Sequence, residues 1–259
     1  GNTQEAEDAF KQSYQQGIKG GNFYAAVYGP INRAWIAFHL GRLDRMMKIC
    51  QESLDEINRL VADVDHHLPL VGGLHILLGA AWFEQNKLEQ AEEALTYGLR
   101  LIQWTGEYEM HITGYTTLAC LLYSQRRHNA AEEVIMALER SWPDGRFYTD
   151  ALRMRFHFYE DLPTAKAIVK VRTWIEDVRR YVLPIDDVIR LVPWDVARQF
   201  QLLTWFRLNI ALARVGRSIE NLRLIMDRIV HLRDEADMHC FVKYFIDYFL
   251  LDTLAHQTI

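Results

Sequence analysis

A short pattern that recurs along the chain constrains its fold more than any other feature. Each copy has a small residue, an aromatic residue or leucine three positions later, a turn, a hydrophobic residue, an acidic or polar residue, and an alanine. The clearest copy begins at Gly79 and Trp82 and continues through residues 86–91, which end in Ala91. Self-similarity at a period of 20–50 residues is typical of solenoids. The pattern therefore predicts a stack of antiparallel helix pairs.

Hydrophobic periodicity supports this prediction. Apolar residues step by three or four along many segments, for example Leu88, Ala91, Leu95 and Leu99, as on the buried face of a helix. Glycine and proline stand between these segments, and strand-like alternation is not convincing anywhere. The expected fold is all-α, an α–α superhelix of tetratricopeptide-like helix pairs that forms one repeat domain over residues 1–259.

The position of the recurring alanine predicts how closely the helices pack. Small residues where two helices cross let the backbones approach, and Ala91, Ala131 and Ala165 occupy that position, whereas Met46 and Asn221 replace alanine in the first and last copies. Successive copies are 45, 40, 34 and 56 residues apart, and only one gap equals the ~34 residues of a plain tetratricopeptide repeat. We expect looser packing at the two exceptions, and a break or an extra helix within residues 181–194.

Composition argues against several functions. The formal charge is −5 and no run of Lys or Arg exceeds two residues, so we expect no direct nucleic-acid binding. No apolar stretch approaches the ~20 residues of a membrane span, so we expect no membrane contact. The three cysteines, Cys50, Cys120 and Cys240, have no metal-binding spacing and are predicted to be buried, reduced thiols of a cytoplasmic protein.

Candidate catalytic and metal-binding groups have simpler interpretations. His66 and His67 are adjacent, whereas zinc ligands are usually two to four residues apart, so a solvated loop is favoured. Neighbours on a helix do not face each other, which argues against a nucleophile pair of His239 and Cys240. The carboxylate pairs at 92–93 and 186–187 fit solvated surfaces. We therefore predict no catalytic residue, no metal site and no cofactor in this chain, which we do not expect to be an enzyme.

A binding groove is the favoured functional hypothesis. If the first helix of each pair lines the concave side, that wall carries aromatic anchors with a few polar groups, which suit a small effector or a peptide segment. The alternative, that several of these rings fill the core between repeats, stays open. The predicted wall consists of Tyr28, Ile31, Trp35, His39, Ile76, Phe83, Thr113, Thr116, Tyr123, Asp150, Met154, His157, Phe206 and Arg207.

Several segments resemble a known family. They are residues 73–79, 86–95, 98–101 and 104–106, and a second patch at residues 172–174, Leu208 and residues 213–215. Over most of residues 26–235 the chain is similar to the helical sensor regions of MalT-like, LuxR-class transcriptional regulators. The resemblance implies a sensor that binds an effector or a partner and thereby releases ATP-dependent self-association. ATP would be bound by a domain absent from this chain, which has no phosphate-binding loop and no helix-turn-helix.

Two hypotheses follow for the whole protein. The residues from Gly1 to Phe10 look like the turn and second helix of a repeat whose first helix is missing, which favours a segment of a longer regulator. The alternative is a free-standing tetratricopeptide adaptor that binds a protein or peptide partner.

Overall fold

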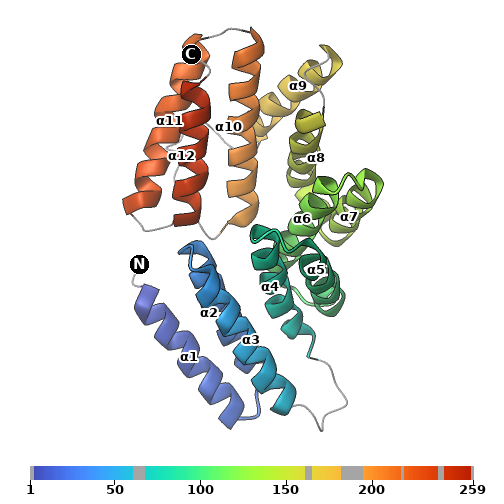
Figure 1. Cartoon of the computed structure of the whole chain (residues 1–259), viewed down its shortest axis with the longest axis vertical. Helices are drawn as coiled ribbons and strands as arrows, with labels where there is room; N and C mark the ends of the chain where they lie inside the picture. The colour runs from blue at the N-terminus through green and yellow to red at the C-terminus, as the bar shows by residue number, and fades with distance from the viewer. Residues whose placement is uncertain are drawn as a thin grey trace. The chain divides into compact units, whose positions relative to one another are not determined.

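The computed structural model describes residues 3–60, 68–160, 165–181, 195–216, 219–238 and 242–257 (Figure 1). Twelve α-helices and two short 3-10 helices account for most of these residues, and no strand occurs among them. The prediction of an all-α fold built from helix pairs is confirmed. Residues 182–194, where the sequence predicts a break or an extra helix, lie outside the described residues.

Packing divides the chain into two compact units. Unit 1 is Gly1–Ser141 and unit 2 is Trp142–Ile259. The boundary falls just before Pro143, where the 3-10 helix Pro143–Gly145 begins. A proline there favours an interruption because proline lacks the N–H that a continuing helix requires.

Unit 1 is built from helix pairs joined by short turns (Figure 1). Helix α1 packs on α2. The pairs are α2 with α3, α4 with α5, and α6 with α7, and the first helix of the middle pair, α4, contacts both α2 and α6. Glu7 of α1 forms an ion pair with Arg45 of α3. The helices of unit 1 are α1 (Thr3–Lys19), α2 (Phe23–His39), α3 (Leu43–Leu60), η1 (Pro69–Val71), α4 (Gly72–Glu84), α5 (Leu88–Ile102), α6 (Tyr108–Ser124) and α7 (His128–Ser141).

The same three-residue turn recurs four times in unit 1. Its central residue has a positive φ and is Gly21, Gly41, Asn86 or Arg126, with φ between 58° and 69°. In each case the third residue donates its backbone N–H to a carbonyl of the preceding helix, as Lys87 does to Trp82 at 2.8 Å. These bonds satisfy carbonyl groups that the end of a helix leaves without an intrahelical partner. The turn predicted after the first helix of each pair is therefore confirmed for the three pairs of unit 1, and α1 joins α2 through the same turn. The turns predicted near residues 162–164 and 216–218 lie wholly or partly outside the described residues.

Small residues allow the helices of a pair to approach, as the sequence predicts. A Cβ built on Gly79 of α4 would lie 2.6 Å from Leu95 Cγ and 3.1 Å from the carbonyl oxygen of Ala91, both in α5. Ala91 and Ala131 are fully buried, and Met46, the larger residue at that position in α3, is buried too. The side chains of Ala165 and Asn221 lie outside the described residues.

Unit 2 contains η2 (Pro143–Gly145), α8 (Arg146–Glu160), α9 (Ala165–Tyr181), α10 (Val196–Gly216), α11 (Ile219–Met238) and α12 (Val242–His256). Its core includes Phe206 of α10 and Tyr248 of α12, and the Tyr248 phenol donates a hydrogen bond to Gln199 Oε1 at 2.9 Å. One face of α12 packs inward through Tyr244, Tyr248, Leu251 and Ala255. Its opposite face exposes Val242, Ile246, Phe249 and Leu250.

The cysteines differ in burial. Cys50 is buried, and this burial raises the pKa of its thiol well above the usual range. Cys120 is half-buried, not fully buried as expected, and neither residue forms a disulfide. Cys240 lies outside the described residues.

Candidate interaction surface

The loop between α5 and α6 is fixed to the end of α5 by one carbonyl group. The backbone oxygen of Ile102 accepts hydrogen bonds from the N–H of Thr105 at 2.8 Å and from its hydroxyl at 2.9 Å. The Nε2 atom of His111 lies 2.8 Å from the same oxygen. Because a carbonyl oxygen can only accept, Nε2 must carry the proton. This anchoring leaves Trp104 on the outside of the loop with 86% of its surface exposed.

A hydrogen bond joins this loop to the start of α2. Asn22 caps α2 by accepting the N–H of Ala25 at 3.1 Å, and Tyr24 follows in the first helical turn. The Tyr24 phenol donates to Glu107 Oε1 at 2.9 Å, although the two residues are 83 positions apart. The bond to this carboxylate raises the pKa of Tyr24, since it stabilises the protonated phenol.

The two segments joined by this hydrogen bond carry several exposed aromatic rings. Tyr28 lies one helical turn after Tyr24, and the two rings stack with their centroids 6.2 Å apart and their planes 12° from parallel. Tyr108 begins α6 directly after Glu107. Tyr24, Tyr28 and Tyr108 are 59%, 38% and 55% exposed. We name this set of residues the acidic–aromatic surface: Tyr24, Tyr28, Trp104, Glu107 and Tyr108.

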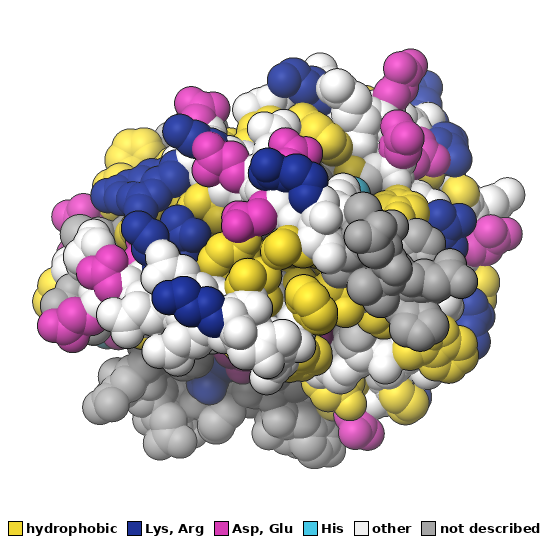
Figure 2. All heavy atoms as spheres, turned by 90° about the horizontal axis from the view of Figure 1, so that it is seen from below, with side chains coloured by type: hydrophobic (Ala, Val, Ile, Leu, Met, Phe, Trp, Pro, Cys, Tyr) yellow, Lys and Arg dark blue, Asp and Glu magenta, His cyan; other side chains and the backbone are white. Residues whose placement is uncertain are grey.

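The acidic–aromatic surface carries negative charge only. Residues 23–32 contain no charged side chain, and residues 103–125 contain Glu107 and Glu109 but no Lys or Arg. The lower face of the molecule, seen in Figure 2, carries hydrophobic side chains together with Lys, Arg, Asp and Glu side chains. Exposed aromatic rings beside unpaired acidic charge are suited to recognition, because large apolar groups are rarely left in water without a partner.

Five of the predicted groove residues of unit 1 belong to its core instead. Ile31, Trp35, His39, Ile76 and Thr113 are buried. The physical reason is the close approach of the first helices: a Cβ built on Gly73 of α4 would lie 2.9 Å from Ile31 Cδ1 of α2 and 3.5 Å from Met110 Cγ of α6. Ile76 likewise lies against Gly98 of α5 and Gly114 of α6, and the ring of Trp35 packs on that of His39. These five buried residues therefore do not line an open wall.

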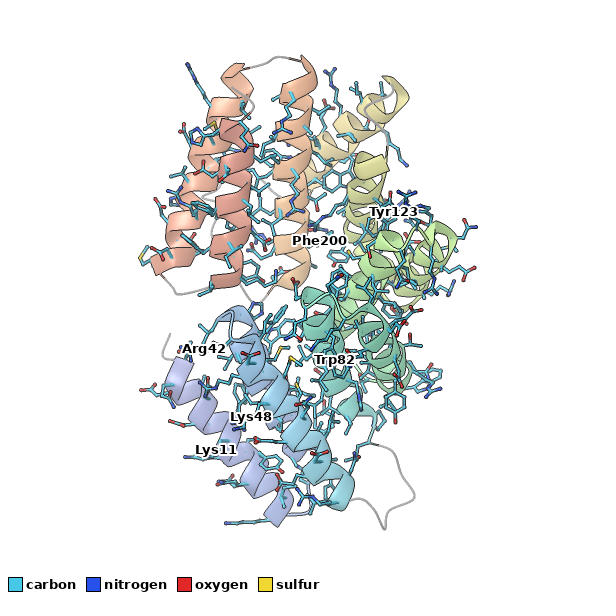
Figure 3. All side chains as sticks on the ribbon, viewed as in Figure 1. Lys11, Arg42, Lys48, Trp82, Tyr123 and Phe200 are labelled. Atoms are coloured by element: carbon cyan, nitrogen blue, oxygen red, sulfur yellow. The ribbon has the colours of Figure 1, made fainter. Side chains whose placement is uncertain are left out.

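The other predicted residues of unit 1 are at least partly exposed but are not brought together. Tyr28 is part of the acidic–aromatic surface, and Thr116 is half-buried in the middle of α6. Phe83 and Tyr123 are half-buried in the last turns of α4 and α6, where Figure 3 labels Tyr123 and Trp82. At 1.5 Å per residue, Tyr123 lies about 22 Å along α6 from Tyr108. The structure therefore separates these residues from Tyr28.

In unit 2, Met154 and Phe206 are buried in the core, while Asp150 and Arg207 are half-buried. Asp150 lies 3.8 Å from Arg146 and 3.7 Å from Arg153, so it is a member of a local ion-pair group on α8. The side chain of His157 lies outside the described residues. The guanidinium of Arg155 lies over the ring of Phe200, which is labelled in Figure 3, at 5.0 Å from the ring centroid.

Tyr24, Trp104, Glu107 and Tyr108 were missed as site residues by sequence reasoning. The Tyr24–Tyr28 spacing of one helical turn was a usable signal, and so was a tryptophan in a glycine-containing loop directly after a predicted helix. The bond between Tyr24 and Glu107 joins distant segments and leaves no local pattern in the sequence.

The other candidate groups of the sequence have structural roles or lie on the surface. Glu92 pairs with Arg127 of the turn before α7 at 2.7 Å, and Glu93 is exposed. Across the described residues, no group of three or more His, Cys, Asp or Glu is placed to hold a metal ion. None of the described helices is both long and apolar enough to cross a bilayer. The pairs at 66–67, 186–187 and 239–240 fall outside the described residues.

The fold of unit 1 is that of a tetratricopeptide-like repeat protein, with helix pairs joined by equivalent tight turns. A family model described as the MalT-like tetratricopeptide region matches residues 1–226, and the chain belongs to this family. Searches of curated proteins and of solved structures gave no match. Domains of this kind generally mediate the binding of proteins or ligands, and the chain is a helical interaction domain of that general class.

Proposed function

We propose that this chain is the sensor region of a MalT-like, LuxR-class transcriptional regulator that acts in the cytoplasm. In this proposal its effector or partner segment binds at the acidic–aromatic surface. Binding there releases the regulator for self-association, which depends on ATP held by another domain. Membership of the MalT-like family supports the sensor role in general terms.

The observation that carries the proposed site is the exposure of four aromatic rings on the two segments that the Tyr24–Glu107 hydrogen bond joins. Trp104 alone leaves 86% of its surface in water, although aromatic side chains bury large areas wherever a core or an interface accepts them. Tryptophan and tyrosine are also the residues that most often dominate binding energy at interfaces. The loop of Trp104 is anchored through Ile102, and the three tyrosines lie on helices, so the backbone that carries the rings needs little further ordering on binding.

A thermal-shift panel of candidate effectors tests the proposed site. A true ligand at a hundred times its dissociation constant stabilises the folded chain by about 2.7 kcal/mol. Trp104→Ala should abolish that shift without lowering the melting temperature of the free protein. Met136→Ala, which truncates another exposed hydrophobic side chain in unit 1, serves as the matched control and should leave the shift unchanged. A ligand whose shift survives Trp104→Ala binds elsewhere and contradicts the proposed site.

The parent gene tests the regulator role separately. We expect a nucleotide-binding domain to be encoded upstream of this region and a helix-turn-helix downstream. An open reading frame that starts and stops near these ends would favour the free-standing adaptor instead.

A further inference from the structure

We propose that the acidic–aromatic surface recognises a cationic protein segment, one that presents arginine or lysine side chains to Glu107 and to the exposed rings. This inference rests on the proposed function, because it names the chemistry of the partner that would bind at the same site. It is carried by three observations: the sign of the charge at the surface, the state of Glu107, and the behaviour of aromatic rings elsewhere in the chain.

The charge of the surface selects a cation. Glu107 is half-exposed and Glu109 is exposed, and the segments that form the surface contribute no Lys or Arg. An aromatic face attracts a cation because its quadrupole is negative above the ring. Acidic and aromatic groups therefore favour the same partner and would both disfavour an acidic one.

Glu107 keeps the capacity to accept further hydrogen bonds. Its Oε1 atom accepts from the Tyr24 phenol at 2.9 Å, and a carboxylate has two oxygens with about four acceptor positions in all. The tyrosine bond thus orients the carboxylate without saturating it. A guanidinium that donates to Oε2 would lie close to Tyr24, whose hydroxyl is bound to the same carboxylate.

Aromatic rings elsewhere in the chain form cation–π contacts with arginine side chains of the same chain. The guanidinium of Arg100 lies 5.2 Å from the ring centroid of Tyr97, and that of Arg155 lies 5.0 Å from that of Phe200. Among the described residues, no cation of the chain itself occupies the rings of the acidic–aromatic surface in this way. Tyr24 and Tyr28 cover one face of each other by stacking, so a cation from another molecule would meet their outer faces or the exposed rings of Trp104 and Tyr108.

The openness of the surface favours a protein segment over a small organic cation. An exposed cation–π contact strengthens binding only about two- to fivefold, so three such contacts give roughly a hundredfold at most. Even a millimolar dissociation constant corresponds to about a thousandfold preference on the 1 M scale. A small cation would need an enclosing pocket, whereas a segment with several basic side chains can add its contacts along α2 and α6.

The experiment uses the whole chain and three probes. The first is a fluorescein-labelled peptide of twelve residues that contains four arginines separated by Gly-Ser spacers. The second has every arginine replaced by glutamine, and the third is tetramethylammonium. Anisotropy should show binding of the arginine peptide at 20 mM salt, at least tenfold weaker binding of the glutamine peptide, and clear weakening at 300 mM salt. Tetramethylammonium at 1 mM should compete by less than a tenth.

Two variants place the binding site. Glu107→Gln keeps an acceptor for Tyr24 but removes the charge, and it should weaken the arginine peptide about three- to fivefold, as expected for an exposed charge pair. Glu133→Gln makes the same change in net charge on α7, at an exposed position, and should leave the affinity unchanged. Circular dichroism confirms that both variants are folded.

The outcomes separate this inference from the proposed function. If the arginine and glutamine peptides bind equally, or if Glu107→Gln and Glu133→Gln behave alike, the cationic partner is wrong even where Trp104→Ala still abolishes binding of an effector. Competition by tetramethylammonium at 1 mM would overturn the choice of a protein segment. A third outcome is that Trp104→Ala leaves the affinity for the arginine peptide unchanged while Glu107→Gln lowers it. That outcome would show that the Trp104 ring does not contribute to binding, and it would overturn the proposed contact between cation and ring.

Discussion

Gly72 and Gly98 face each other across the η1–α4 and α5 segments of unit 1. A Cβ built on Gly72 would lie 2.4 Å from the carbonyl oxygen of Gly98, and a Cβ built on Gly98 would lie 2.7 Å from the carbonyl oxygen of Gly72. Real Cβ atoms do not approach an oxygen so closely. Glycine at both positions therefore allows the two backbones to touch.

Replacing Gly98 with alanine should strain this contact. The added methyl meets backbone, which cannot rotate away as a flexible side chain does, and overpacking of this kind costs about 1–3 kcal/mol. We expect Gly98→Ala to lower the free energy of unfolding by about 2 kcal/mol in urea titrations. Gly106→Ala is the matched control in unit 1, because a Cβ there meets nothing within 4 Å. Equal stability of the two variants would contradict the contact.

The ion pair between Arg233 and Asp252 should matter more than other charges of unit 2. Arg233 of α11 lies 2.7 Å from Asp252 of α12, and the Asp252 side chain is only 11% exposed. Removing Arg233 leaves this nearly buried carboxylate with His256, 3.5 Å away, as its remaining partner, and breaking such a buried pair costs about 3 kcal/mol. We expect Arg233→Ala to lower the free energy of unfolding by roughly that amount. Arg223→Ala, at an exposed position of the same helix, should change it by less than about 0.5 kcal/mol.

Stability should fall in alkaline solution. Burial raises the pKa of Cys50 and of Tyr248, so both stay protonated in the folded chain at a pH where the unfolded chain has lost the proton. The contribution of such a group is complete below its unfolded pKa, about 8.5 for cysteine and about 10 for tyrosine, and is lost as the pH rises above that value.

Urea titrations between pH 7.5 and pH 10.5 measure this loss. Each fully shifted group contributes a slope of up to about 1.4 kcal/mol per pH unit. Cys50→Ala has a lower stability at every pH because it leaves a cavity, but its decline between pH 8.5 and pH 10 should be shallower. Parallel curves for the wild type and this variant would show that the thiol does not contribute.

The two faces of α12 should respond differently to substitution. Leu251 is buried in the core of unit 2, whereas Ile246 is 50% exposed. Leu251→Ala should cost about 2–5 kcal/mol, while Ile246→Lys should stay within about 0.5 kcal/mol. Thermal unfolding of both variants compares the faces directly, and a large loss for Ile246→Lys would mean that this face is covered.

The helices and their crossings were accessible from the sequence because they depend on local spacing. Gly79, Ala91 and the turn at Asn86 follow one another within a few positions, and each has the role that the repeat pattern predicts. The burial of α4 was accessible in principle, since residues 72–81 are apolar with the single exception of His75, and a helix that is hydrophobic all round is buried.

The interaction surface depends on relationships that a periodic pattern does not contain. The sequence predicts that Trp35 and Ile76 lie on first helices, but whether such a side chain meets solvent depends on how closely the neighbouring helix approaches. Ile76, for example, lies against Gly98 of α5 and Gly114 of α6, two residues far from it in the sequence. The partnership of Tyr24 with Glu107 and the unit boundary at Ser141 likewise follow from packing between distant segments.

The hydrogen bond from Tyr24 to Glu107 joins the start of α2, in the first helix pair of unit 1, to the residue before α6, in the third pair. The second pair, α4 and α5, lies between them in the sequence. A stack of repeats bends and twists like a spring, with small rotations that add up from one pair to the next. A hydrogen bond between non-adjacent helix pairs opposes the rotations that would move the start of α2 away from the start of α6. If a partner binds this carboxylate, as we propose, then binding at this point is linked to the curvature of unit 1.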